Sequence, residues 1–156
     1  MGRTSHSVTC VLRQCGETDV RAIRALQESW DEEEITYGFR PADEATIAGA
    51  IGPYFYLAEA DGQIVGFVAG SVREGHDTCI MPDGQAYLEI DDLYVRPEFR
   101  AQGIGRRLLD KVLEEAKARG VRKAFIYSST KDLFRAMRFY ESAGFQPWFA
   151  RMFCEL

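Results

Sequence analysis

Apolar residues recur every three or four positions in several stretches of the chain, and this spacing predicts amphipathic helices. The longest of these stretches runs to Arg119 and is followed by Gly120, the residue type that most often follows a helix. Another begins at Ser129 or Thr130, either of which can cap a helix N-terminus, and it ends at Gly144. The predicted helices cover residues 20–30, 43–51, 104–119 and 130–144.

Shorter apolar runs separated by turn residues predict β-strands between these helices. Asp61 and Gly62 lie between two such runs, and an Asp-Gly pair in that position predicts a β-hairpin. Residues 86–127 form a strand–helix–strand unit, which requires one pair of parallel strands. The predicted strands cover residues 7–13, 54–60, 64–72, 86–95, 124–127 and 148–154.

Together these elements predict a single domain over residues 1–156, in the α/β (α+β) class, with a mixed, mostly antiparallel central sheet flanked by helices. The composition agrees, because 46% hydrophobic and 28% charged residues are typical of a globular domain. No apolar run approaches the roughly 18 residues that span a bilayer, and no secretory signal opens the chain. We therefore expect a cytoplasmic protein with no membrane partner.

Charge and cysteine content narrow the classes of partner and cofactor. The net charge of -5 and the pI of about 5.1 argue against a general nucleic-acid-binding surface and favour a cationic partner. The four cysteines contain no C-x-x-C pair, and only two histidines accompany them. This pattern excludes a zinc site built from close-spaced pairs, so we expect no metal. The thiols are expected to be reduced in the cytosol; they are Cys10, Cys15, Cys79 and Cys154.

A glycine-bearing turn joins a predicted strand to the longest predicted helix. Free N–H groups at a helix N-terminus bind anions, and Gly103 and Gly105 allow a phosphate to approach the backbone closely. Arg100 and Arg106 add positive charge beside the turn. The spacing fits neither a Walker A loop nor the dinucleotide motif G-x-G-x-x-G, whose sixth position is Leu108 here. The turn is therefore either an anion-binding site or simply a tight strand-to-helix connection.

Three motifs carry a resemblance to a known family. The segment from Arg100 to Gly105 reads R-A-Q-G-I-G and matches the R/Q-x-x-G-x-G/A motif of the GNAT superfamily of N-acetyltransferases. Residues 93–95 resemble that family's central strand, and residues 139–145, F-Y-E-S-A-G-F, resemble its late F-Y-E-x-x-G-F motif. The order and distances of the three motifs also agree with the family. The resemblance implies the acyl-CoA N-acyltransferase fold and acetyl-CoA as co-substrate, with its pyrophosphate on the glycine turn.

The resemblance also implies which residues bind acetyl-CoA. Family members often carry an Asn that contacts the cofactor, three residues before the helical Ala that corresponds to Ala136. This chain has Leu133 there, and Asp132 or Ser129 is expected to take its place. The implied acetyl-CoA site consists of Leu93, Tyr94, Val95, Arg100, Ala101, Gln102, Gly103, Ile104, Gly105, Arg106, Ser129 and Asp132.

The strand predicted over residues 86–95 carries three carboxylates, although Asp is poor in strands and close acids repel one another. Alternation by two places Glu89 and Asp91 on the face of Leu93, and Asp92 on the opposite face unless a bulge intervenes. The acids either face water or take part in catalysis.

A carboxylate suits the chemistry of acetyl transfer. The acceptor amine must lose a proton, since a lysine-like amine has a pKa near 10.4, and a carboxylate can accept that proton directly or through a water. In relatives that resemble this chain, the base is a glutamate six residues before the position of Val95, which implies Glu89. Asp91 is the second candidate and can instead hold a cationic amine, and Asp92 is the third.

A tyrosine supplies the other half of the expected chemistry. The departing thiolate resembles that of cysteine, with a pKa near 8.5, and a phenol with a pKa near 10 can protonate it. The resemblance implies that Tyr140, in the F-Y motif, is this acid, and that a backbone N–H near Val95 polarises the thioester carbonyl. The alternative is that the ring of Tyr140 only fills the core.

The acceptor side is expected in the acidic, aromatic stretch between the first two predicted helices, Trp30 to Phe39. Carboxylates would steer a cationic amine and aromatic faces would bind it by cation–π contacts. The candidate acceptor residues are Trp30, Glu33 and Tyr37, with Asp91 from the strand. The alternative is a solvated helix end.

The sequence thus predicts an N-acetyltransferase that moves an acetyl group from acetyl-CoA to a small cationic amine by direct attack. Two alternatives stay open. In the first alternative, the acceptor is a protein lysine or N-terminal amine. In the second, the domain binds acyl-CoA without turnover. Neither nucleic acid nor membrane is expected as a partner, and the apolar final strand could pair two copies into a homodimer.

Overall fold

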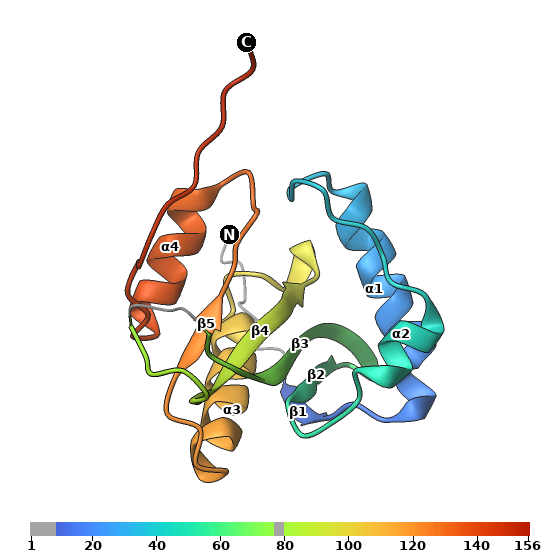
Figure 1. Ribbon diagram of the computed structural model, residues 1–156. Helices are drawn as coiled ribbons and strands as arrows, with labels where there is room; N and C mark the ends of the chain where they lie inside the picture. The colour runs from blue at the N-terminus through green and yellow to red at the C-terminus, as the bar shows by residue number, and fades with distance from the viewer. Residues whose placement is uncertain (1–8, 77–79) are drawn as a thin grey trace, which may run out of the picture.

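The computed structural model describes residues 9–76 and 80–156. A single five-stranded sheet forms its centre, with the strands in chain order, β1-β2-β3-β4-β5 (Figure 1). Neighbours are antiparallel from β1 to β4, whereas β4 and β5 are parallel, which confirms the predicted mixed sheet. The strands are β1 (Cys10–Gln14), β2 (Phe55–Ala60), β3 (Gln63–Glu74), β4 (Ala86–Val95) and β5 (Ala124–Ile126).

Helices cover both faces of the sheet. The helices α1 and α2 lie on one face, and α3 lies on the other, where residues of α4 also pack (Figure 1). Two 3₁₀ turns, Glu17–Asp19 and Pro97–Phe99, precede α1 and α3. The helices are α1 (Val20–Glu32), α2 (Glu44–Gly49), α3 (Ile104–Ala118) and α4 (Leu133–Ser142).

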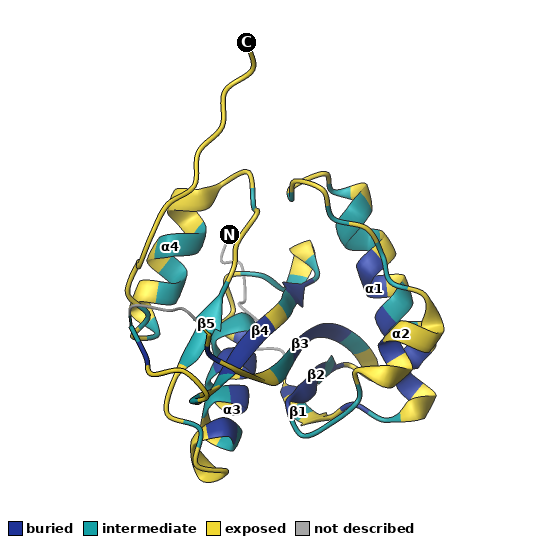
Figure 2. Cartoon of the chain, viewed as in Figure 1, coloured by how far each residue is buried: buried dark blue, intermediate teal, exposed yellow. Residues whose placement is uncertain are grey.

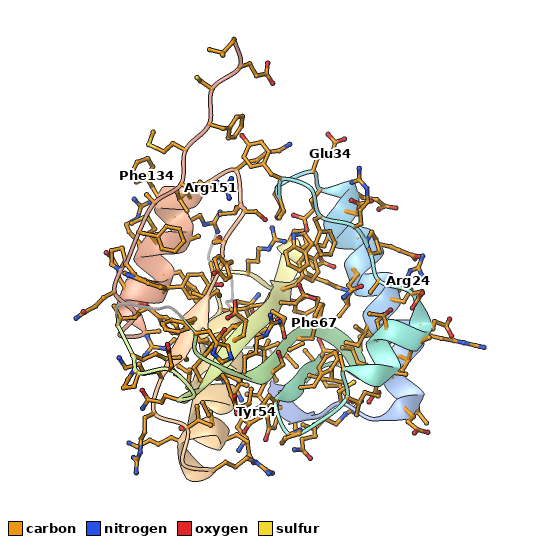
Figure 3. The ribbon with its side chains drawn as sticks, in the orientation of Figure 1. Arg24, Glu34, Tyr54, Phe67, Phe134 and Arg151 are labelled. Carbon is orange, nitrogen blue, oxygen red and sulfur yellow. The ribbon has the colours of Figure 1, made fainter. Side chains whose placement is uncertain are left out.

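Two hydrophobic clusters hold the three layers together. On the α3 face, Leu108 and Val112 pack against Leu88 and Ile90 of β4. On the α1 face, Phe67 belongs to the cluster that joins α1 to the sheet, and it lies in the middle of the molecule (Figure 3). Burial is deepest in the central strands and lowest in α4 and the C-terminal segment (Figure 2). The buried central strands therefore hold the site residues in place.

Turn chemistry explains several of the boundaries. Asp61 and Gly62 both have positive φ, 51° and 74°, which is the type I′ geometry that matches the twist of a hairpin. Gly120 and Gly144 adopt positive φ just beyond α3 and α4. One predicted cap was wrong, because the N-cap of α4 is Asp132, whose carboxylate accepts a hydrogen bond from the backbone N–H of Arg135.

The ends of the chain differ from the sequence prediction. The first strand begins at Cys10 in the structure, and residues 7–8 of the prediction lie outside the described residues. The predicted strand 148–154 was wrong: this segment is irregular, and the chain after α4 passes beside that helix before its C-terminal end extends outward (Figure 1). Its apolar pattern suits a strand, but a strand also needs a neighbouring edge in register, which the pattern cannot supply. Trp148 stacks on Phe125 without forming a backbone ladder.

A β-bulge interrupts the pairing of β3 with β4. Ala69 pairs with Asp92 and the next residue, Gly70, pairs with Ile90, so Asp91 has no partner on β3. Such an extra residue reverses the alternation of side chains beyond it. The strand that carries the carboxylates is therefore irregular at its acidic centre.

Gly70 is required for this close approach of the two strands. A Cβ at Gly70 would lie 2.7 Å from the carbonyl oxygen of Glu89, which is too close for any L side chain. We expect Gly70→Ala to lower the free energy of unfolding by about 1–3 kcal/mol. Urea denaturation measures this, with Gly49→Ala as the control, since no atom lies within 4 Å of a Cβ there. Equal stability of the two variants would contradict the account of the bulge.

Candidate active site

The bulge gathers all three carboxylates of β4 on the face covered by α1. Leu88 and Ile90 belong to the cluster on the α3 face, so Glu89 between them points toward α1. Asp92 also points toward α1, because its carboxylate accepts a hydrogen bond from Gln27 of that helix at 3.3 Å. The sequence placed Asp92 on the face opposite Glu89 unless a bulge intervened, and the inserted Asp91 is such a bulge, which brings Asp92 to the face of Glu89.

Asp91 reaches the same face through its contacts with β3. Its carboxylate accepts hydrogen bonds from Ser71 at 3.0 Å and from Arg73 at 2.9 Å, and both donors alternate onto the α1 face of β3 with Phe67. Leu93 and Val95 instead pack in the cluster on the α3 face. The prediction that Glu89 and Asp91 share a face with Leu93 was therefore wrong.

The three carboxylates differ in their surroundings. Glu89 is only 5% exposed and accepts no hydrogen bond from the described residues. Burial raises its pKa, the nearby Arg73 partly offsets this, and Asp91 raises it further. Burial raises the pKa of Asp92 to about 6, helped by Asp91 and opposed by the Gln27 hydrogen bond. Two acids with raised pKa values on one face form a candidate site for accepting protons.

The raised pKa of Asp92 has a consequence for stability. An unfolded Asp titrates near 3.8, so between there and pH 6 the folded protein binds more protons, and its stability falls as the pH rises through that window. We expect Asp92→Asn to raise the free energy of unfolding at pH 7 by about 1–3 kcal/mol. The asparagine oxygen can still accept from Gln27. Urea titrations at pH 4 and pH 7 test this, and a variant less stable than the wild type at pH 7 would contradict it.

One edge of β4 is open beside these acids. Pairing with β5 covers only Leu88 to Ile90, although β4 continues to Val95. The N–H of Arg96 bonds to Val65 of β3, so by alternation the N–H groups of Leu93 and Val95 point to the opposite, unpaired edge. The backbone donor that the sequence analysis expected near Val95 therefore lies on an edge that no described strand occupies.

The glycine turn follows directly from this edge. Ala101 and Gly103 have positive φ, 59° and 79°, and Gly103 is the N-cap of α3. The first intrahelical bond runs from Arg107 to Gly103, so the N–H groups at positions 104–106 have no acceptor within the helix. A Cβ at Gly105 would make only ordinary contacts, at 3.7 Å or more, so the protein's own packing does not require glycine there.

The arginines of the turn bind protein groups. Arg106 donates to Asp110 at 2.8 Å and to the carbonyl of Ser142 at 2.7 Å. Arg100 donates to the carbonyl of Val95 at 2.8 Å, and its two terminal nitrogens bind Glu33 at 2.8 and 2.7 Å. The side chain of Gln102 reaches the carbonyl of Glu98 at 3.4 Å. Protein groups therefore bind most of the side-chain donors of the turn, and its backbone N–H groups are available to an anion.

Tyr140 lies in α4 against the α3 face of the sheet. Its ring contacts Phe139 and Phe145 edge to face, with centroids 5.0 and 5.7 Å apart. Burial raises the pKa of Tyr140 to about 12, so the phenol is protonated at neutral pH. Within the described residues its hydroxyl makes no hydrogen bond, which leaves the proton available to another group.

Two of the predicted acceptor residues, Trp30 and Tyr37, lie in different surroundings. Trp30 stacks on Phe39 and on Tyr94, and its indole N–H donates to Thr36 at 2.9 Å. Tyr37 lies farther out, 55% exposed, beneath the ammonium of Lys131. Trp30 therefore packs on β4, as Glu33 also contacts it through the hydroxyl of Tyr94, whereas Tyr37 contacts Lys131.

A backbone bridge joins the acceptor loop to the segment before α4. Thr36 and Thr130 form an isolated β-bridge, and the N–H of Tyr37 donates to the carbonyl of Ser129 at 2.9 Å. The bridge connects the loop after α1, on one face of the sheet, to the segment between β5 and α4. Ser129 is thus placed here by its backbone, while Asp132 caps α4.

A cavity of about 300 Å³ opens near the end of α1. None of the β4 carboxylates lines it, and it mixes acidic with basic side chains. We therefore do not equate it with the reaction site. Its lining residues are Trp30, Asp31, Glu34, Thr36, Phe39, Arg40 and Lys131.

Sequence reasoning missed Gln27, Ser71 and Arg73, which hold Asp92 and Asp91. Gln27 did leave a signal, because it is a polar residue at a core-facing position of an amphipathic helix. It is 5% exposed, and its side-chain oxygen also accepts from the N–H of Ala42 at 2.8 Å. Ser71 and Arg73 gave no signal in the sequence, since the bulge at Asp91 depends on how β3 pairs with β4.

Comparison with known proteins identifies the family. A family model described as the acetyltransferase (GNAT) family matches residues 20–145, and the chain belongs to this family. An N-acetyltransferase from Archaeoglobus fulgidus is 38% identical over 86 residues, which cover 55% of each chain. The thialysine N-epsilon-acetyltransferase of Bos taurus is 25% identical over 149 residues, covering 87% of this chain and 84% of that protein. The chain spans 55% of the length of the Archaeoglobus relative and 38% of that of an N-acetyltransferase from Methanocaldococcus jannaschii.

Solved structures share the fold. The aminoglycoside N-acetyltransferase AAC(6')-Iy, in complex with the bisubstrate analogue CoA-S-monomethyl-acetylneamine, superposes with a TM-score of 0.72 at 19% identity, over 95% of this chain and 98% of that chain. An acetyltransferase from Clostridium acetobutylicum with acetyl-CoA gives a TM-score of 0.69 at 22% identity, over 95% and 96%. These likenesses confirm the predicted fold class.

Two features are absent from the described residues. Within residues 9–76 and 80–156, no helix has the length and apolar character needed to cross a membrane. Over the same ranges, no three side chains of the metal-ligating types gather into a group that could hold an ion.

Proposed function

We propose that this protein transfers an acetyl group from acetyl-CoA to a primary amine on a small cationic acceptor. The observation that carries the proposal is the arrangement around β4. Three carboxylates share the face covered by α1, an open strand edge lies beside them, and a helix N-terminus with free N–H groups follows directly. The acids suit a cationic amine, and the N–H groups suit the pyrophosphate of CoA.

The donor would bind along the open edge of β4. The N–H groups at the start of α3 would hold the pyrophosphate, and Gly103 and Gly105 place no side chain beside them. The N–H groups of Leu93 and Val95 would hydrogen-bond the donor's chain and polarise its thioester carbonyl. The side chains of Arg100 and Arg106 would act by shaping the turn, since protein groups already bind them.

Two side chains would move protons. The neutral amine nitrogen attacks the thioester carbon, forming the C–N bond, and the C–S bond then breaks. Glu89 takes the proton that the nitrogen loses, directly or through a water, because its carboxylate has a raised pKa and accepts no competing hydrogen bond from residues 9–76 and 80–156. Tyr140 donates its phenolic proton to the leaving thiolate. No covalent enzyme intermediate is required.

The acceptor would bind over the acids, beneath α1. Asp92 and Asp91 would attract its cationic groups, and Trp30 would supply an aromatic wall. Two of the matched proteins act on amines by name, the thialysine and aminoglycoside acetyltransferases, and this supports an amine acceptor. Glu33 is already bound by Arg100 and Tyr94, so it would not contact the acceptor directly.

Thiol release from acetyl-CoA tests the proposal against polyamines, aminoglycosides, free amino acids, lysine peptides and peptides with a free N-terminus. We expect release with one class of small cationic amine. Release with peptides alone would move the acceptor to a protein lysine or N-terminal amine. Tight acetyl-CoA binding without turnover would indicate a non-catalytic acyl-CoA-binding module, and the absence of any binding would overturn the assignment of the turn.

A further inference from the structure

Glu33 makes the densest set of charged contacts around the glycine turn. It follows the last residue of α1, and its carboxylate accepts three hydrogen bonds. Arg100 donates at 2.8 Å to one oxygen and at 2.7 Å to the other, and the hydroxyl of Tyr94 donates at 2.7 Å. The carboxylate side chain is 19% exposed, so most of this charge is withdrawn from water.

The position of this carboxylate requires an explanation. The C-terminal end of a helix carries negative partial charge, and α1 ends beside two further acids, Glu32 and Glu34. Burial acts to raise the pKa of Glu33, but the hydrogen bonds from Arg100 and Tyr94 outweigh it and hold the pKa below its ordinary value. Glu33 is therefore charged at neutral pH, and Arg100 is the cation that compensates it.

Each of the three guanidinium nitrogens of Arg100 donates a hydrogen bond within the protein. Its Nε donates to the carbonyl of Val95 and both terminal nitrogens bind Glu33, while its guanidinium lies 5.5 Å from the centre of the Tyr94 ring. The residue after it, Ala101, has a positive φ of 59°, which disfavours any residue other than glycine. We call the paired hydrogen bonds between Glu33 and Arg100 the Glu33 clamp. The clamp fixes Arg100 at the start of the turn, next to the strained backbone of Ala101.

We infer that Glu33 is a positioning residue, which holds the glycine turn in the conformation that binds the CoA pyrophosphate without touching either substrate. The inference rests on the proposed function and assigns Glu33 a role other than acceptor binding. It also links the two halves of the site. The same helix end carries Trp30, which stacks on Tyr94, so the acceptor wall and the donor turn share one anchor.

The test compares Glu33→Gln with the wild type. The amide keeps the size of the side chain but loses the charge that binds Arg100. We expect amide hydrogen exchange at Phe99, Arg100 and Arg107, whose N–H groups are hydrogen-bonded at the two ends of the turn, to become at least tenfold faster. The Kd for CoA by calorimetry should rise about tenfold. Turnover of S-acetylpantetheine, which lacks the pyrophosphate, should stay within twofold of wild type. The KM for the amine should change little.

Two controls separate positioning from general damage. Glu28→Gln removes an exposed ion pair with Arg24 on the same helix and should leave exchange at the hydrogen-bonded amides of the turn and the CoA affinity unchanged. Arg100→Gln should weaken CoA binding as much as Glu33→Gln does, and the double variant should show no further loss, because both changes open the same clamp.

Several outcomes would overturn the inference. Unchanged exchange at Phe99, Arg100 and Arg107 in Glu33→Gln would show that the clamp does not hold the turn. A rise in the KM for the amine alone would return Glu33 to acceptor binding, and an equal defect with S-acetylpantetheine would place its effect outside the pyrophosphate. A wild-type protein that binds no CoA would instead defeat the proposed function, and the exchange measurement alone would then decide whether Glu33 orders the turn.

Discussion

Replacing Glu89 by Gln is expected to lower kcat by about 100- to 10,000-fold, the usual contribution of a general base. The amide matches the carboxylate in size but cannot accept the amine's proton. Because the base must be deprotonated, wild-type kcat/KM should rise with pH through a midpoint above the ordinary glutamate value of 4.5, in the direction that burial shifts Glu89. Steady-state rates from pH 5 to 9 measure both effects, and the variant should lose this acidic limb.

Two comparisons make the result specific to Glu89. Glu114→Gln changes an exposed acid on the far helix α3 and should keep full activity. Calorimetry should give the same acetyl-CoA affinity for Glu89→Gln as for the wild type, since Glu89 faces α1 rather than the turn. If Asp92→Asn lost the larger part of kcat while Glu89→Gln kept it, the assignment of the base would pass to Asp92.

Tyr140→Phe is expected to lower kcat by about 100-fold or more, with little change in the affinity for acetyl-CoA. The phenol is protonated at neutral pH because burial raises its pKa to about 12, and removing its hydroxyl leaves the thiolate to depart without a proton donor. Rapid-quench measurement of a single turnover would place the loss in the chemical step rather than in product release.

The structure offers a matched control for this variant. Tyr127 is 72% exposed near the end of β5, and Tyr127→Phe should retain wild-type rates. The ring of Tyr140 packs between Phe139 and Phe145, so the phenylalanine should preserve the thermal midpoint. Full activity in Tyr140→Phe would mean that the thiolate leaves without this acid and that Tyr140 is a core residue.

Local patterns in the sequence determined most of the frame. The hairpin at Asp61-Gly62, the long strand at residues 86–95 and the helix that ends before Gly120 are specified within a few residues, by turn chemistry and by hydrophobic periodicity. The glycine turn could also be predicted from the sequence, because the free N–H groups of a helix N-terminus depend only on local residues.

Contacts between distant segments decided the rest. Nothing near Asp91 announces a bulge, since the bulge depends on how β3 pairs with β4, and it alone brings Asp92 to the face of Glu89. The 67-residue separation of Glu33 from Arg100 likewise hides their ion pair from any local pattern. Residues 148–154 carry a strand-like pattern without a strand, because backbone pairing needs a second edge in register. Periodicity specifies which residues can share a face, whereas register and pairing, which are set by tertiary contacts, determine which of them meet.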